Sequence, residues 1–227
     1  MRRSAWLWLG LLWGMTLLFT SCSTSSGSGN DAQLRFLLAS PDAPQVNVLL
    51  DGLSVAGNLG YGNATGYISQ KAGSHQVQVV TAVGSLPVFS ETISLNASSF
   101  QTLLFTGPAA SIQPVMLNDT PPTIVINDAY VRVVNASAAM GAADVYIVPA
   151  GSGIGGVPPA TAGLAFDQDT GYQLTVAGNY EVFMTTPGTS QARLSTGPIS
   201  LTSAQNQTLV ALDGPSGVFI YALLKDQ

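Results

Sequence analysis

Charged residues are scarce in this chain. They make up 8% of its 227 residues, against roughly a quarter in an average soluble domain, so a folded domain must cover its surface largely with neutral polar side chains. The formal net charge is -5, and the few basic residues form no patch, which excludes nucleic acid as an expected partner. The hydrophobic share of 46% is that of a folded protein rather than a disordered one.

Histidine and cysteine each occur once, as His75 and Cys22. A single histidine with no cysteine nearby argues against a transition-metal site, and no second histidine exists to act as a base. A lone cysteine cannot form a disulfide within the chain, so the fold must rely on its hydrophobic core. We therefore predict no catalytic residues and no bound cofactor.

The N-terminal segment has the pattern of a secretory signal. Two arginines precede the nearly continuous apolar stretch Ala5–Phe19, which is shorter than the ~20 residues that a membrane-spanning helix needs. Small polar residues and a cysteine, Thr20-Ser21-Cys22, follow at once. We predict that residues 1–21 are a cleaved signal peptide and that the Ser/Gly-rich residues 22–31 form a flexible tether.

The residues Phe19-Thr20-Ser21-Cys22 resemble the lipobox of bacterial lipoproteins. In that family the cysteine sulfur carries a diacylglyceryl group, the signal is cut just before it, and the new amine is acylated. The resemblance implies that Cys22 is the lipidation site and that this covalent lipid anchors the protein to the cell envelope. Because Ser23 rather than aspartate follows the cysteine, it also implies the outer membrane of a Gram-negative bacterium.

Segments of the mature chain recur in the same order at a spacing of about a hundred residues, the size of a domain rather than of a solenoid repeat. The clearest pairs are Leu34–Ser40 with Val131–Ser137, Thr65-Gly66-Tyr67 with Thr170-Gly171-Tyr172, and Gln101-Thr102-Leu103 with Gln207-Thr208-Leu209. The second copy carries an insertion in the Gly/Pro-rich stretch from Pro149 to Ala165. We predict a first domain at residues 32–118, a proline-containing linker at 119–123 and a second domain at 124–227.

Short segments rich in β-branched residues, each bounded by turn residues, indicate strands in both copies. Residues His75–Val79 alternate strictly, so we expect Gln76 and Gln78 to face water while Val77 and Val79 enter the core. No mature segment has convincing helical periodicity. The predicted fold is all-β, with two tandem antiparallel β-sandwiches of immunoglobulin-like or transthyretin-like type.

The stretch Ala39–Gly52 resembles the opening signature of a bacterial domain family known only as the domain of unknown function numbered four-three-nine-seven. Its members read His-Ala-Ser-Pro-Asp-Ala-Pro, followed by a Val-Asp-Val strand and an Asp-Gly turn. The resemblance extends over both copies, although the family's histidine is Leu38 in the first copy and Asn135 in the second. It implies a fold and no established activity.

Two loops are candidate binding sites. In Pro41-Asp42-Ala43-Pro44 the prolines favour a rigid turn, and we expect the Asp42 carboxylate to cap nearby amides, with ligand binding as the alternative. Gly151–Gly156 matches G-x-G-x-x-G, but it lacks the following helix that a dinucleotide site requires. We predict an exposed loop whose Ile154 and Val157 contact a partner.

The segment Asp167–Gly171 begins like a calcium-binding loop, with the pattern D-x-D-x-G. Its twelfth position is Gly178 instead of glutamate, and the aligned residues Gly62–Gly66 of the first copy lack both carboxylates. A turn is the main interpretation, and a calcium site at Asp167 and Asp169 is the alternative.

Together these features predict a lipid-anchored, non-enzymatic envelope protein that binds another envelope protein or a glycan, or that acts as a structural spacer. A hydrolase that uses the acidic residues around Asp167 and Asp169, with calcium, is the alternative from a different class.

Overall fold

The computed structural model describes residues 30–123 and 126–226. The predicted signal peptide, Cys22 and all but the last two residues of the predicted tether lie outside these ranges. The described residues contain seventeen strands and only two short 3-10 turns, Ala109–Ser111 and Pro215–Gly217. No helix among them is long and apolar enough to cross a membrane.

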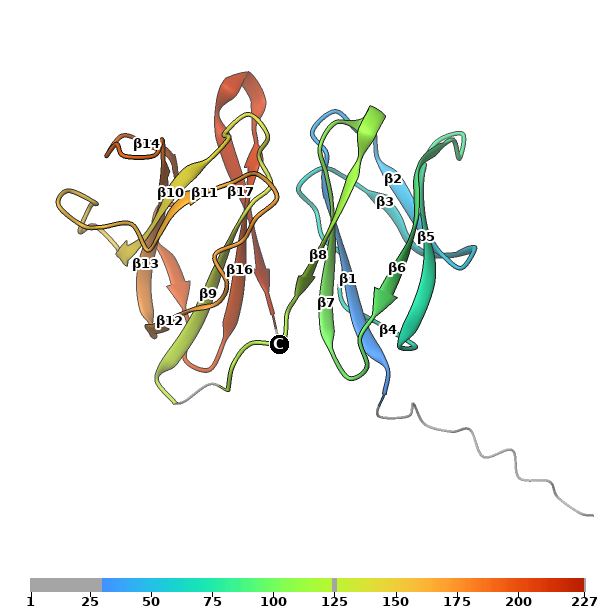
Figure 1. The fold of residues 1–227 in the computed structure, drawn as a ribbon, viewed down its shortest axis with the longest axis horizontal. Helices are drawn as coiled ribbons and strands as arrows, with labels where there is room; N and C mark the ends of the chain where they lie inside the picture. The colour runs from blue at the N-terminus through green and yellow to red at the C-terminus, as the bar shows by residue number, and fades with distance from the viewer. Residues whose placement is uncertain (1–29, 124–125, 227) are drawn as a thin grey trace, which may run out of the picture.

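The strands form four sheets that belong to two halves of the molecule (Figure 1). The strands of the first half are β1 (Ala32–Ala39), β2 (Val46–Leu50), β3 (Leu53–Leu59), β4 (Ile68–Gln70), β5 (Gly73–Thr81), β6 (Pro87–Leu95), β7 (Phe100–Thr106) and β8 (Gln113–Asn118). The strands of the second half are β9 (Asp128–Asn135), β10 (Ala143–Pro149), β11 (Thr161–Leu164), β12 (Gln173–Val176), β13 (Gly178–Thr185), β14 (Ala192–Ser195), β15 (Ile199–Leu201), β16 (Asn206–Asp213) and β17 (Phe219–Lys225).

The two halves have the same strand order. In the first half an inner sheet β4-β1-β7-β8 packs on an outer sheet β3-β2-β5-β6, and in the second half β12-β9-β16-β17 packs on β11-β10-β13-β14, with β15 also paired to β13. The inner sheets are those that face the other half (Figure 1). The prediction of an all-β, sandwich-type chain is confirmed.

The inner sheets are mixed, whereas antiparallel sheets were predicted. β1 runs parallel to β7, and β9 runs parallel to β16, while every other strand pair is antiparallel. A parallel pair needs a long crossover connection. Here the connection runs through the strands of the outer sheet and one edge strand of the inner sheet, β4 in the first half and β12 in the second.

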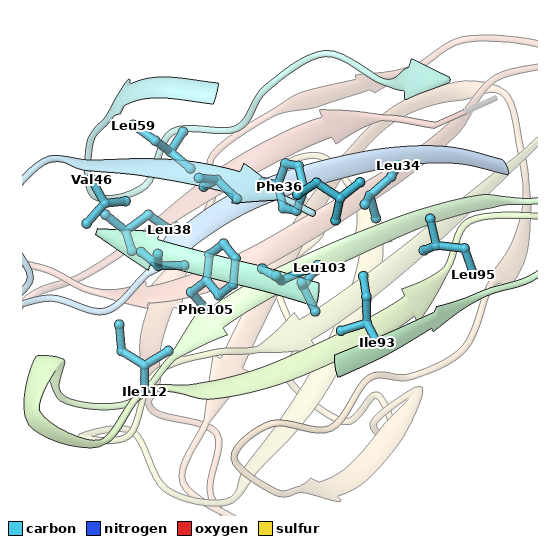
Figure 2. Close-up of a cluster of buried hydrophobic side chains, with 14 of the residues drawn as sticks. Leu34, Phe36, Leu38, Val46, Leu59, Ile93, Leu95, Leu103, Phe105 and Ile112 are labelled. Carbon is cyan, nitrogen blue, oxygen red and sulfur yellow. The ribbon is translucent and has the colours of Figure 1, made fainter. Parts of the chain in front are cut away.

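The core of the first half lies between its inner and outer sheets (Figure 2). Because side chains alternate along a strand, β1 directs Leu34, Phe36 and Leu38 into this core, and the residues between them face the second half. The predicted alternation of β5 is confirmed for its core face, since Val77 and Val79 are fully buried. Gln76 is exposed, as predicted, whereas Gln78 is half-buried.

A further hydrophobic cluster joins the two inner sheets to each other. Its buried members are Leu37, Ala39, Leu104 and Leu117 from the first half and Val134, Ala136, Val210, Leu212 and Leu224 from the second. The central inner strands are therefore buried on both faces, so the residues of β1, β9 and β16 are nearly all buried. Any polar side chain on the same face of β1 or β9 must lie within this interface.

Candidate functional site: a buried clasp and an adjoining groove

Two arginines occupy equivalent places in the interface between the halves. Arg35 lies on β1 and Arg132 on β9, and their side chains are 4% and 3% exposed. Asp119 follows β8 and Asp226 follows β17, and both carboxylates are 0% exposed. These four residues, which we call the clasp, bring two positive and two negative charges together where water is largely excluded.

Each arginine of the clasp binds the aspartate that follows the last strand of the other half. Arg35 Nη2 lies 2.6 Å from Asp226 Oδ1, and Arg132 Nη2 donates a hydrogen bond to Asp119 Oδ1. Arg35 Nη2 also lies 3.3 Å from Asp119 Oδ2, in its own half. Arg132 Nη2 lies 4.0 Å from Asp226 Oδ2. Backbone contacts repeat the exchange, because Arg35 Nη1 donates to the carbonyl of Lys225 at 2.9 Å and Arg132 Nη1 to that of Asn118 at 2.8 Å.

Two threonines connect the arginines to the aspartates within each half. Thr102 Oγ1 accepts a hydrogen bond from Arg35 Nε at 2.8 Å and donates one to Asp119. Thr208 Oγ1 accepts from Arg132 Nε at 3.0 Å and donates to Asp226. The strand register places Thr102 of β7 opposite Arg35 of β1 and Thr208 of β16 opposite Arg132 of β9. Each threonine can therefore hold the guanidinium plane of the arginine beside it.

Two tyrosines complete the arrangement. The Tyr67 hydroxyl donates to Asp119 Oδ2 at 2.8 Å, and the Tyr172 hydroxyl donates to Asp226 Oδ2 at 2.8 Å. The ring centroids of Tyr67 and Tyr172 lie 4.5 and 4.6 Å from the arginine Cζ atoms of their own halves, a cation–π contact. Burial raises the pKa of both phenols far above its ordinary value, with the nearby carboxylates adding to the effect. Both hydroxyls therefore remain donors at neutral pH.

The clasp constrains how the halves sit against each other. Removing a charge from water is costly, and a buried pair offsets this cost only when its geometry and its remaining hydrogen bonds are satisfied. Here the reciprocal bonds give hydrogen-bond partners to both carboxylates and both guanidinium groups. These bonds form only when the two inner sheets are packed in the observed position. A slip of one sheet over the other would leave buried charges unpaired.

A groove of about 510 Å³ opens beside the clasp. One side is the segment Gly62–Tyr67, the other is Ala222–Lys225 of β17, and Arg35 lies between them. The groove is thus built from both halves. A smaller cavity of about 160 Å³ lies at the other end of the interface, where Asp42 and Asp213 are among its lining residues.

A protein-family profile described as "Domain of unknown function (DUF4397)" matches residues 32–146. The chain belongs to this family. The match covers every strand of the first half and runs through β9 into β10, so the family resemblance of the Ala39–Gly52 signature is confirmed. It is one match, and it does not by itself show two copies of the domain.

No curated protein matches this DUF4397 chain. Among solved structures, it is similar to the carbohydrate-binding module CBMbc (family CBM26) of Eubacterium rectale Amy13K in complex with maltoheptaose, at 12% identity and a TM-score of 0.29, covering 87% of this chain and 97% of that one. It is also similar to a candidate cell adhesion protein of Bacteroides fragilis, at 9% identity and a TM-score of 0.22, covering 87% and 98%. Both TM-scores are too low to support an argument about function.

Asp42, within the DUF4397 signature, acts as an amide cap. Its Oδ1 accepts a hydrogen bond from the Ala109 amide at 2.8 Å and is 3.4 Å from the Ser40 hydroxyl. The carboxylate thereby joins the turn after β1 to the 3-10 turn that follows β7. A ligand-binding role for Asp42 stays a prediction.

The inserted loop of the second half differs from the prediction at Ile154. This side chain is only 8% exposed and packs with Tyr146, Val148 and Phe183 on the outer face of its sheet. The placement of Ile154 on the exposed surface was therefore wrong, because a Gly/Pro-rich sequence does not reveal that the loop folds back over apolar side chains. Val157 is 42% exposed, and its contact with a partner stays a prediction.

Asp167 and Asp169 lie in a turn beside β9. Asp169 Oδ1 accepts the Gly171 amide at 2.7 Å, and Asp167 has a positive φ of 62°, both typical of aspartate in turns. Burial raises the pKa of the Asp167 carboxyl, an effect that the Thr106 hydroxyl opposes. Among the residues that the structure describes, no three His, Cys, Asp or Glu side chains come together as a metal site would require. Calcium binding here stays a prediction.

None of the clasp residues was among the predicted sites, although the sequence carries a signal for them. The repeats align Arg35 with Arg132, Thr102 with Thr208, and Tyr67 with Tyr172. An arginine kept at the same place in two otherwise apolar strands is costly to bury and calls for a buried partner. The partners themselves, Asp119 and Asp226, are adjacent to the arginines only in the packed structure.

Proposed function

We propose that this protein is a lipid-anchored envelope protein that binds a partner in the groove between its two clasped halves, without catalysing a reaction. The observation that carries the proposal is the groove itself, whose two sides come from different halves held together by buried ion pairs. Binding sites are commonly concave and largely preformed, and they occur preferentially at interfaces between domains.

Preorganisation is the physical basis of this role. Ordering two mobile domains around a ligand would reduce the affinity by the entropy lost. The clasp removes that cost before binding, because it fixes Gly62–Tyr67 relative to β17. We further propose that the second half is a diverged second copy of the family domain, supported by its identical strand order and the reciprocal contacts of the clasp.

The anchor part of the proposal rests on Cys22, its lipobox context and the residues that follow. A flexible tether of that length reaches on the order of 17 Å. It joins the fold at Asp31, whose carboxylate lies 3.4 Å from the Ser69 hydroxyl, and Ser69 is two residues from Tyr67 of the groove. One end of the groove would therefore lie close to the point where the tether joins the fold, and we propose that the partner is another component of the envelope.

The anchor is tested by the Cys22→Ser variant. We expect it to lose metabolic labelling with a fatty-acid probe and to leave the membrane fraction, because the sulfur and the processed amine carry the acyl chains. Persistent labelling of the variant would contradict lipidation at Cys22.

The groove is tested by cross-linking in intact cells. A photoreactive residue at Asn63, an exposed lining residue, should capture one envelope partner. The same residue at Ser90, exposed on β6 of the outer sheet, is the matched control and should not. Equal capture from both positions, or none from Asn63, would contradict a binding role for the groove.

A further inference from the structure

We infer that the groove takes an extended, acidic peptide segment, which pairs with the open edge of β17 as an added strand. The inference deepens the proposed binding role and rests on it. In strand addition, main-chain hydrogen bonds supply much of the affinity, and side-chain pockets and charges supply the selectivity. The surroundings of β17 offer both unpaired main-chain groups and a charged side chain.

The backbone of β17 has unused hydrogen-bonding groups on the groove side. β17 pairs only with β16. The Asp226 amide donates toward β16, to the Asn206 carbonyl at 2.8 Å, whereas the Lys225 carbonyl points away from β16 and accepts from Arg35. The amide and carbonyl of one residue point to one side of a strand, and those of the next residue point to the other. The main-chain amides and carbonyls of Leu223 and Tyr221 therefore also point away from β16, as the Lys225 carbonyl does. Among the described residues, none bonds to these main-chain groups.

The opposite side of the groove has a similar unused edge. The Asn63 carbonyl and the Thr65 amide are bonded to β1, through Leu38 and Phe36. The amide and carbonyl of Ala64, between them, consequently point away from β1. An extended segment in the groove would meet main-chain donors and acceptors on both sides.

The equivalent edge in the first half is interrupted by a proline. There β8 occupies the place of β17, and its Asn118 carbonyl accepts from Arg132 just as that of Lys225 accepts from Arg35. The residue that corresponds to Tyr221 is Pro114, because Pro114 pairs with Phe105 of β7 as Tyr221 pairs with Ala211 of β16. Proline has no amide hydrogen and is a common means of protecting an edge strand from pairing. The edge of β8 therefore lacks a donor that the edge of β17 keeps at Tyr221.

The charge of the groove favours an acidic occupant. Two charged residues line it, Arg35 and Lys225. The charge of Arg35 is balanced by Asp226 and Asp119 in the clasp, so Lys225, which forms no ion pair among the described residues, carries the free charge of the groove. The exposed Lys225 side chain stands where the first half has Asn118. Ala64 stands where the second half has the exposed Asp169, since Ala64 pairs with Leu37 of β1 and Asp169 pairs with the equivalent Val134 of β9. The groove at β17 thus has one more base and one fewer acid than its counterpart.

Selection from a phage-displayed library of random linear peptides on the immobilised mature protein provides the test. We expect enriched peptides in which β-branched residues alternate with Asp or Glu. Their affinity should fall about tenfold or more in Leu223→Pro, which removes one open-edge donor worth about one hydrogen bond to the ladder. Leu223→Ala is the matched control and should bind almost as well as the wild type. Because the Leu223 amide is not used in pairing with β16, the proline variant should keep the fold, which its melting temperature checks.

Two further measurements keep the test decisive if Leu223→Pro does not fold. The amide hydrogens of Tyr221 and Leu223 should exchange quickly in the free protein and become protected in the peptide complex. Lys225→Glu should weaken the acidic peptides about tenfold more than Lys225→Gln does. Unprotected amides, or peptides that bind Leu223→Pro and wild type equally, would overturn strand addition.

The outcomes separate this inference from the proposed function. If the Asn63 cross-linker captures a glycan, or captures a protein whose binding Leu223→Pro leaves unchanged, the groove binds a partner but strand addition is wrong. If the cross-linker captures nothing in cells while selected peptides bind with the expected dependence on Leu223, the edge is competent and the proposed envelope role is wrong.

Discussion

Arg35 and Asp226 form an ion pair of 2.6 Å although 191 positions separate them in the chain. Arg132 and Asp119 form the reciprocal pair only 13 positions apart. The two pairs are nevertheless equivalent, because each joins an arginine on the first strand of one half to the aspartate after the last strand of the other. The interface is therefore closed by reciprocal contacts, one of which uses Asp119, the first residue of the predicted linker.

The clasp predicts a large loss of stability when one charge is removed. Asp226→Asn keeps the shape of the side chain but leaves Arg35 without its closest carboxylate, and breaking a buried pair in this way costs about 3–5 kcal/mol. Urea unfolding should show this loss. The half-buried Asp128, whose side chain forms no ion pair among the described residues, provides the control Asp128→Asn, which should change the free energy of unfolding by less than about 0.5 kcal/mol. Equal effects of the two variants would show that the clasp does not hold the halves together.

The buried tyrosines predict a loss of stability at high pH. The pKa values of Tyr67 and Tyr172 are raised by burial, and that of Tyr61, which donates to the Asp213 carbonyl at 2.6 Å, is raised to about 12. A phenol with a raised pKa contributes stability that is fully present below its unfolded pKa of about 10 and is lost as the pH rises above it. Tyrosinate absorbance should therefore appear for these residues only together with unfolding. The double variant Tyr67→Phe/Tyr172→Phe should show a shallower alkaline decline, and an unchanged slope would contradict this assignment.

The only histidine predicts a separate pH dependence near neutrality. His75 Nδ1 lies 2.7 Å from Asp51 Oδ2, and Nε2 lies 2.8 Å from the Lys71 carbonyl, so both nitrogens face acceptors. The bond to Asp51 raises the pKa of His75, and partial burial opposes this; the same bond lowers the pKa of Asp51. The contribution of His75 should be complete below about pH 6.5 and disappear as the pH rises through its folded pKa.

Proton NMR titration of this single imidazole gives the folded pKa directly. The stability difference between wild type and His75→Gln should shrink as the pH rises from about 6 to 9. A histidine that titrates at or below its ordinary value would contradict the predicted ion pair.

The inserted loop predicts a contrast between two of its apolar residues. Ile154→Ala removes a side chain that packs with Tyr146, Val148 and Phe183 and should cost about 2 kcal/mol. Val157→Ala changes a side chain that is 42% exposed and should cost less than about 0.5 kcal/mol. Thermal unfolding of the two variants compares them directly, and similar costs would mean that the loop does not cover the outer sheet as described.

Local pattern was sufficient for much of the fold. Short β-branched segments and turn residues predicted strands in both halves, and the alternation of residues 75–79 predicted which valines are buried. The ordered repeats predicted that equivalent residues recur, and Arg35 and Arg132 are indeed equivalent in the structure. These features depend on neighbours in sequence and on the period of a strand, which is why they can be read without a structure.

Contacts between distant strands were decided only by the tertiary structure. The parallel pairing of β1 with β7 depends on how the outer sheet returns the chain, and the burial of Ile154 depends on the face over which its loop folds. The clasp and the groove depend on two sheets meeting in one register, since Asp226 reaches Arg35 only after both halves are packed. Sequence determined the strands, the repeats and the presence of two arginines in apolar runs; packing determined their partners, because the free energy of a buried charge depends on what lies beside it in space.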